Sequence, residues 1–232
     1  MYKKIFLALL LFIADRLYPQ SVTAFKEIQE VDSIALTKST TSYFAKLYSK
    51  TMLQIEKQLT GMDTATISQI RELEINFSNY FLKACNKYKD SGHTDSTWKI
   101  YFETSGLSPL QLKLLGINAH INGDLWQALR DSYTVHEIQS ISKTVFLFHQ
   151  SLLKIYNDVY HEAKAESRKV KTMDLLSLGF SEKYGKHLLS KWRKRQIKLA
   201  TLYYFKQNRF EQKRKRTDRK KTRIDKLIIR RL

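Results

Sequence analysis

The scarcity of proline and glycine is the feature that most constrains how this chain can fold. Its 232 residues include two prolines and seven glycines, so few positions suit the tight turns that many short strands would require. Apolar residues make up 43% of the chain, enough for a core of ordinary size. Cys85 is the only cysteine, so an internal disulfide is excluded. We therefore expect an all-α, single-domain helical bundle that is stabilised by packing.

The first 24 residues have the features of a secretory signal peptide. Two lysines precede ten apolar residues at positions 5–14, and a run of that length is too short to cross a bilayer, which takes about 20 residues. Val22 and Ala24 form a small-residue cleavage site. We expect cleavage after Ala24 and a periplasmic or secreted mature protein. The alternative is a cytoplasmic protein in which this segment forms an amphipathic first helix.

The positive charge of the chain is concentrated at its C-terminus. Residues 191–232 contain eighteen Lys and Arg against three acidic residues, a net charge of +15, whereas residues 1–190 carry +4. In the same segment Ile224, Leu227 and Ile228 recur at helical spacing. A cationic amphipathic helix is typical of proteins that bind an anionic membrane surface or envelope polymer. Nucleic acid is the rival partner, and a solvated, partly frayed helix needs no partner.

These features divide the chain into a signal peptide at 1–24, an all-helical domain at 25–190 and a basic amphipathic C-terminal extension at 191–232. Within the domain, apolar residues recur at three- and four-residue steps, as in helices with one buried face. Ser108 followed by Pro109 predicts a helix start. Thr134 and Glu137 have the spacing of a capping box at the start of a later helix.

The helix that we expect from Ser108 to about Arg130 contains an unusual stretch, LGINAHINGDLWQALRD. At about 100° per residue, Lys113, Asp124, Gln127 and Asp131 lie within about 40° of His120 and form one polar stripe. Asn118 and Asn122 lie on the opposite side among apolar residues. Each asparagine must find hydrogen-bond partners there or cost a few kcal/mol.

Two glycines flank this polar stripe within the same helix. Gly116 and Gly123 each cost roughly 1 kcal/mol relative to alanine inside a helix, and a solvent-exposed face has no use for them. Glycine at these positions lets another backbone or a ligand approach closely. We therefore expect the polar residues of this stretch to act as one buried or pocket-lining unit in a central helix. Its members are Asn118, His120, Asn122 and Asp124.

The stretch GINAHINGDL resembles the signature Gly-Met-Asn-Ala-His-Ile-Asn-x-Asp-Leu of an uncharacterised bacterial family, domain of unknown function 5995, with Ile117 at the methionine position. The resemblance covers roughly residues 40–130. It implies a helical fold, no established activity, and Asn118, His120, Asn122 and Asp124 as the motif positions. Upstream positions that also match are Phe44, Tyr48, Thr51, Leu73, Phe77 and Trp98.

A second resemblance would supply a chemistry. His120, Gly123, Asp124 and Gln127 match the first half of the signature His-x-x-Gly-Asp-x-x-Gln-Pro-x-His of zinc-dependent phospholipases C and related single-strand nucleases. In the second half, Ala128 and Arg130 replace the proline and the final histidine. The similarity therefore covers half of a short motif.

His120 and Asp124, four residues apart on a helix, can ligate one divalent metal such as zinc. Further ligands would come from another segment, and the candidates are Glu74, His93, Asp95, His136 and His149. Three classes of function follow: a metal-dependent hydrolase of phosphoesters, a ligand-binding protein without catalysis, and a structural protein whose polar network fixes helix packing. The sequence decides neither whether the protein is an enzyme nor its oligomeric state.

Overall fold

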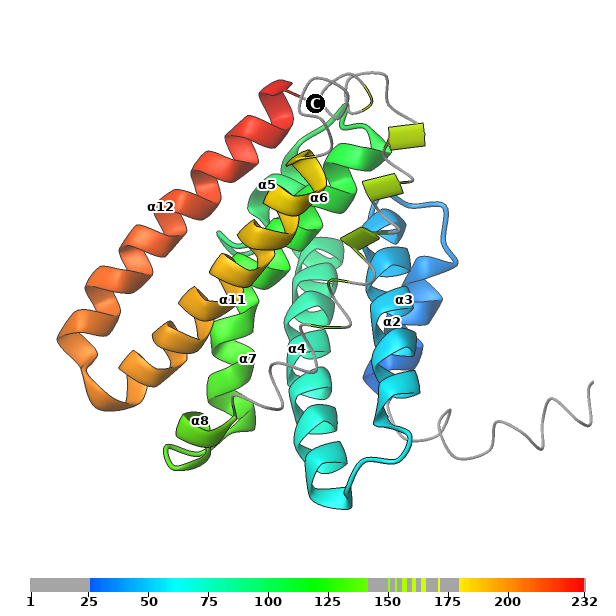
Figure 1. Ribbon diagram of the computed structural model, residues 1–232. Helices are drawn as coiled ribbons and strands as arrows, with labels where there is room; N and C mark the ends of the chain where they lie inside the picture. The colour runs from blue at the N-terminus through cyan, green and yellow to red at the C-terminus, as the bar shows by residue number, and fades with distance from the viewer. Residues whose placement is uncertain are drawn as a thin grey trace, which may run out of the picture.

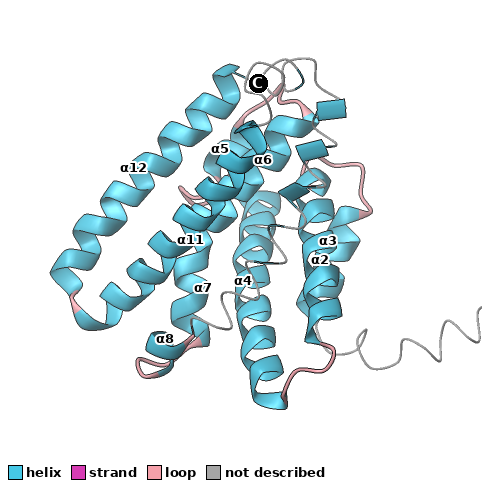
Figure 2. Cartoon of the chain, in the orientation of Figure 1, coloured by secondary structure: helices cyan, strands magenta, loops and turns pink. Residues whose placement is uncertain are grey.

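The described part of the chain forms a bundle of helices and contains no strand (Figures 1 and 2). The structure is a computed structural model that describes residues 26–141, isolated residues between 150 and 171, and residues 180–231. The predicted all-α fold is confirmed. No helix within these ranges is both long and apolar enough to cross a membrane. The predicted signal peptide lies outside the described residues and stays a prediction.

The first half of the chain supplies the helices of one side of the bundle. These are α2 (Lys26–Ala35), α3 (Ser42–Leu59) and the long α4 (Thr64–Ser91), which are followed by the short α5 (Lys99–Glu103). Asp63 caps α4 by accepting a hydrogen bond from the backbone N–H of Thr66, which satisfies one of the free donors at the helix start. Gly92 ends α4 in the left-handed conformation, with φ of 70°, which glycine adopts without strain.

One continuous helical rod occupies the centre of the bundle. It consists of α6 (Pro109–Ala119), one π-helical turn η1 (His120–Asp124) and α7 (Leu125–Ser132). The predicted start is confirmed, because the Ser108 hydroxyl accepts from the Gln111 N–H and the Gln111 side chain accepts from the Ser108 N–H. Helices α3, α4, α11 and α12 all contact this rod (Figure 1). The predicted central position of the motif helix is therefore confirmed.

The basic C-terminal segment folds as a helical hairpin that packs on the central rod. Helix α11 (Phe180–Phe205) runs along α7 and η1, and α12 (Gln207–Arg231) returns antiparallel to it against α6 and η1 (Figure 1). Leu199, Ala200 and Phe210 are buried in this packing, as is the side chain of Asp225. Residues 191–231 thus form part of the same bundle, with only one face left to solvent.

The remaining sequence features fall partly inside the described residues. Thr134 and Glu137 exchange the predicted reciprocal hydrogen bonds at the start of the short α8 (Glu137–Ser140). His161 and His187 are exposed, whereas His149 lies outside the described residues. The core of the bundle centres on aromatic side chains beside the central rod, chiefly Phe77, Phe81 and Trp98.

Candidate functional site

The motif residues lie at the point where the central rod changes its helical pitch. In η1 the Leu125 N–H donates to the carbonyl of His120, five residues earlier, whereas an α-helix makes the same bond four residues back. Such single π-turns inside α-helices occur frequently at functional sites. The turn spans the motif residues from His120 to Asp124. The π-helical turn thus occurs at the same residues as the sequence motif.

His120 and Asp124 form a buried pair. The His120 Nδ1 atom lies 3.1 Å from Asp124 Oδ2, and the two residues are 3% and 2% exposed. The indole N–H of Trp98 donates to the same carboxylate oxygen at 2.9 Å. Asp95, in the loop before α5, accepts a hydrogen bond from the Trp98 backbone N–H. This loop therefore helps to position Trp98, which binds the carboxylate of Asp124 beside His120.

Aromatic rings enclose the imidazole of His120. Phe77 stacks on it with ring centroids 3.5 Å apart, and Tyr48 and Phe44 meet it edge-on at 4.5 and 5.4 Å. Burial consequently lowers the pKa of His120 well below its ordinary value, so the ring is neutral at neutral pH. Burial also raises the pKa of Asp124, although the hydrogen bond from Trp98 opposes that shift. The family-matched aromatic positions are thus the walls around His120.

The proton of the neutral imidazole has a defined place when Asp124 is ionised. Nδ1 then donates to Asp124, and Nε2 keeps a free lone pair. Nε2 is buried and has no hydrogen-bond partner among the described residues. The site therefore offers one basic nitrogen in apolar surroundings.

Asn118 and Asn122 form a second polar group on the other side of the rod. The Asn122 amide donates to the Asn118 carbonyl oxygen at 2.8 Å. The Asn118 amide donates to Asp225 Oδ1 at 2.6 Å and to the Lys221 backbone carbonyl at 3.1 Å, both on α12. Lys221 and Asp225 also form a buried ion pair at 2.9 Å. The asparagines therefore bond α12 to the central rod, and all four motif residues are buried as predicted.

Sequence analysis did not identify the partners that the C-terminal hairpin supplies. On α11, Gln196 is fully buried, and its side-chain amide donates to the backbone carbonyl of Asn122 at 3.3 Å. On α12, Lys221 and Asp225 pair with Asn118 and with each other. A signal was present in the sequence, because Asp225 is one of three acids within a strongly basic segment.

The predicted polar stripe is only partly correct. Asp124 lies beside His120, but Lys113 and Gln127 are half-buried and Asp131 is exposed. Asp131 accepts hydrogen bonds from Tyr80 and Arg130 at the surface. The helical wheel assumed a regular α-helix throughout, whereas the π-turn shifts the phase of every residue that follows it.

The two motif glycines allow close packing of side chains. A Cβ atom on Gly116 would overlap the ring of Phe44, and one on Gly123 would overlap the Cγ2 methyl of Thr97. The prediction of close approach is confirmed, but protein side chains, not a ligand, fill the space. Gly116 thus lets Phe44 reach His120, and Gly123 lets the residue before Trp98 pack against the π-turn.

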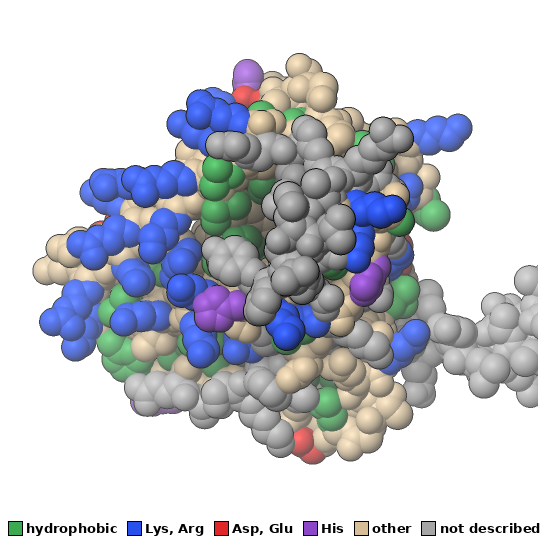
Figure 3. Space-filling view, turned by 45° about the horizontal axis from the view of Figure 1, so that its top comes forward, with side chains coloured by type: hydrophobic (Ala, Val, Ile, Leu, Met, Phe, Trp, Pro, Cys, Tyr) green, Lys and Arg blue, Asp and Glu red, His purple; other side chains and the backbone are tan. Residues whose placement is uncertain are grey.

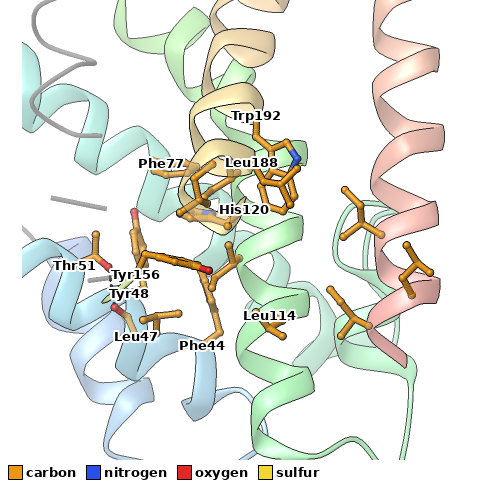
Figure 4. A pocket seen from close by; sticks show the side chains of 17 residues that line it. Phe44, Leu47, Tyr48, Thr51, Phe77, Leu114, His120, Tyr156, Leu188 and Trp192 are labelled. Carbon is orange, nitrogen blue, oxygen red and sulfur yellow. Dashed lines mark hydrogen bonds between the residues drawn. The ribbon is translucent and has the colours of Figure 1, made fainter. Parts of the chain in front are cut away.

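An apolar cavity of about 450 Å³ lies between the central rod, α3, α11 and α12 (Figure 4). His120 lines it together with Tyr48, Leu114 and Trp192. The Tyr48 hydroxyl is hydrogen-bonded to Ser78, and the Thr51 hydroxyl donates to the Leu47 carbonyl. With these hydroxyls satisfied by the protein, the described walls present mainly carbon to the cavity.

The structure separates most of the suggested metal ligands from the His120–Asp124 pair. His93 is exposed and lies beside Glu103, Asp95 caps the turn before Trp98, and His136 is exposed. Glu74 is fully buried, and neither of its carboxylate oxygens has a hydrogen-bond partner among the described residues. Across those residues, no three His, Cys, Asp or Glu side chains gather as a metal-binding group. Zinc binding stays a prediction.

The fold and site define a class: an all-α bundle in which a π-turn of the central helix carries a buried His–Asp pair and an asparagine pair beside an apolar cavity. The chain belongs to the family of unknown function DUF5995, whose model matches residues 23–231. The match extends beyond the resemblance at residues 40–130 and includes the C-terminal hairpin. Neither a curated protein nor a solved structure matches the chain.

Proposed function

We propose that the protein binds an apolar small molecule in the cavity beside His120. The cavity itself carries this proposal. Protein interiors are close-packed, and voids larger than a water molecule are few. A space of about 450 Å³ lies within the range of roughly 300–1,000 Å³ of small-molecule sites.

The polar residues of the motif support this function by fixing the walls of the cavity. Hydrogen bonds from Asn118 hold α12 against α6, and α12 closes the cavity with Ile224 and Ile228. The Trp98–Asp124–His120 series fixes one ring in the wall. Buried hydrogen bonds of this kind favour one defined arrangement of the helices that they join.

Binding of Nile red, an uncharged apolar dye whose fluorescence rises in apolar surroundings, tests the proposal. We expect saturable binding of about one dye per chain, because the cavity is one space of the size of a small-molecule site. Leu114→Trp enlarges a wall residue and should abolish binding. Leu53→Trp adds the same side chain at a position that is 56% exposed and should leave binding unchanged. Equal binding by all three proteins would place the dye outside the cavity and overturn the proposal.

A metal-dependent hydrolase of phosphoesters is the second candidate. One observation favours it: His120 has an unpartnered Nε2, and a carboxylate orients its other nitrogen, an arrangement suited to a general base or a metal ligand. Elemental analysis of the purified protein should then find about one zinc per chain, and His120→Asn should remove it together with hydrolysis of bis(4-nitrophenyl) phosphate. Protein without zinc that takes up none on addition would contradict this candidate.

A further inference from the structure

The cavity reaches the surface between the two helices of the C-terminal hairpin. Leu227 lines it and is 57% exposed, whereas Ile228, the next residue of α12, is buried. On α11, Leu188 and Trp192 also line the cavity and are half-buried. A ligand therefore enters or protrudes beside Leu227.

Five cations lie along the two helices α11 and α12, which contact each other; we call them the cationic cluster. They are Arg195 and Lys198 on α11, and Lys213, Arg216 and Lys220 on α12. Burial lowers the pKa of Lys213, and the positive charges of the other four lower it further. Figure 3 shows Lys and Arg gathered over this side of the molecule, with hydrophobic side chains beside them.

The cluster and the opening share one face of the hairpin. At about 100° per residue, Lys213, Arg216, Lys220 and Leu227 lie within about 60° of one another on α12. Lys220 precedes Leu227 by seven residues, or about 10 Å along the helix. On α11, Arg195 follows Trp192 by three residues, which also places the two on neighbouring positions of one face.

The acidic residues of α12 pair with other cations and do not neutralise the charge of the cationic cluster. Glu211 and Asp218 both pair with Arg214, and Asp225 pairs with Lys221 inside the bundle. Among the described side chains no ion pair involves a member of the cationic cluster. Five like charges held together without a counter-charge favour an anion at this position.

We propose that the ligand of the cavity is an amphiphile whose hydrocarbon chain occupies the cavity and whose anionic head group, a carboxylate or a phosphate, binds the cationic cluster. This inference rests on the proposed binding of an apolar molecule and adds the chemical class of the ligand. Arg195 and Lys220, which lie nearest in sequence to the lining residues Trp192 and Ile224, hold the head group.

Displacement of Nile red by three compounds with the same chain tests the inference: dodecanoate, dodecyl phosphate and dodecanol. We expect at least one of the anions to bind on the order of tenfold more tightly than the alcohol, and added salt to weaken the anion alone. The tighter anion identifies the head group. Equal affinity of all three compounds would overturn the inference while leaving the apolar-ligand function intact. Failure of Nile red to bind at all would instead overturn the proposed function.

Charge-neutral variants locate the head group. Arg195→Gln combined with Lys220→Gln should reduce the affinity for the preferred anion on the order of tenfold and leave that for dodecanol unchanged. The matched control combines Lys87→Gln with Lys89→Gln, two exposed cations on α4, and should change neither affinity. Equal losses in both double variants would show that only the overall charge matters and would overturn the assignment to the cluster.

Discussion

Replacing Asn118 by leucine tests how strongly the motif holds α12 on the central rod. Leucine has a similar volume, so the main effect is the loss of polar partners. The substitution removes the partner of two buried groups, the Asn122 amide and Asp225 Oδ1. The Lys221 carbonyl loses its bond from Asn118 but lies inside α12 and keeps its intrahelical bond. A buried polar group without its partner costs about 1–3 kcal/mol, and more when it is charged. We therefore expect the free energy of unfolding to fall by at least about 2 kcal/mol, a large share of the roughly 5–15 kcal/mol of a typical domain.

Urea unfolding followed by far-ultraviolet circular dichroism measures this loss. The midpoint should fall with an unchanged m-value, as expected when stability changes and the unfolded state does not. Asn86→Leu is the control, because Asn86 is exposed on α4 and surface substitutions usually change stability by less than about 0.5 kcal/mol. A loss below about 1 kcal/mol in Asn118→Leu would refute the argument that these hydrogen bonds hold α12 in place.

A double-mutant cycle with Asn122→Leu separates the pair from the rest of the network. The double variant has no Asn122 amide to leave without a partner. Its loss of unfolding free energy should therefore be smaller than the sum of the losses in the two single variants. Additive losses would mean that the Asn118–Asn122 hydrogen bond contributes nothing of its own.

Three further predictions concern other parts of the bundle. Burial and then the charge of Glu56 raise the pKa of Glu74 well above 4.5, so the folded state holds this proton more tightly than the unfolded state. Stability should therefore fall as the pH rises above 4.5. Glu74→Gln should make Tm decline less steeply with pH, and parallel curves of Tm against pH for the two proteins would contradict this. Gly123→Ala should cost about 1–3 kcal/mol through overlap with Thr97, and Thr97→Ala should relieve most of that cost, whereas an equal loss in both backgrounds would exclude the overlap. Arg219→Gln and Arg223→Gln, at two exposed positions, should each weaken the predicted membrane binding by about 1 kcal/mol. Sedimentation with phosphatidylglycerol vesicles at low salt measures this loss. A protein that binds DNA but not the vesicles would favour nucleic acid as the partner.

Local sequence signals were sufficient to predict the helices and the burial of the motif. Few turn-forming residues favour long helices, and the capping pattern at Ser108 marks the start of the central rod. Two asparagines among apolar neighbours require buried partners, which places the helix in the interior whatever the tertiary arrangement. These inferences depend on properties of one segment, and therefore needed no knowledge of its neighbours.

The directions of the side chains around the central rod and the residues that contact them could not be predicted in the same way. The π-turn adds one residue to a single helical turn, and a helical wheel drawn at a constant angle cannot represent it. Gly116 and Gly123 signalled a close approach, but the approaching groups, Phe44 and Thr97, come from other segments. The partners of Asn118 are 103 and 107 residues away in sequence.

The C-terminal hairpin shows that the sequence pattern of a basic amphipathic helix is compatible with two different environments of its apolar face. An apolar stripe on a basic helix has the same periodicity whether it faces a membrane or a protein core. Ile224 and Ile228 face the cavity, so the apolar stripe is largely used inside the bundle. Only contacts between segments distinguish these two uses.

The position of α12 also determines when the protein can finish folding. Asn118 and the cavity wall depend on residues 221–228, which are synthesised after helices α2–α11. Helices α2–α7 can collapse earlier on the ribosome, as N-terminal parts of chains generally do, but the nascent bundle must carry unpaired asparagines and an open apolar face until the last helix docks. Contacts of such long sequence separation are slow to form, so this step should limit the folding rate. A stop codon or frameshift between codons 207 and 221, which removes these residues of α12, should therefore leave a chain that binds chaperones and is degraded.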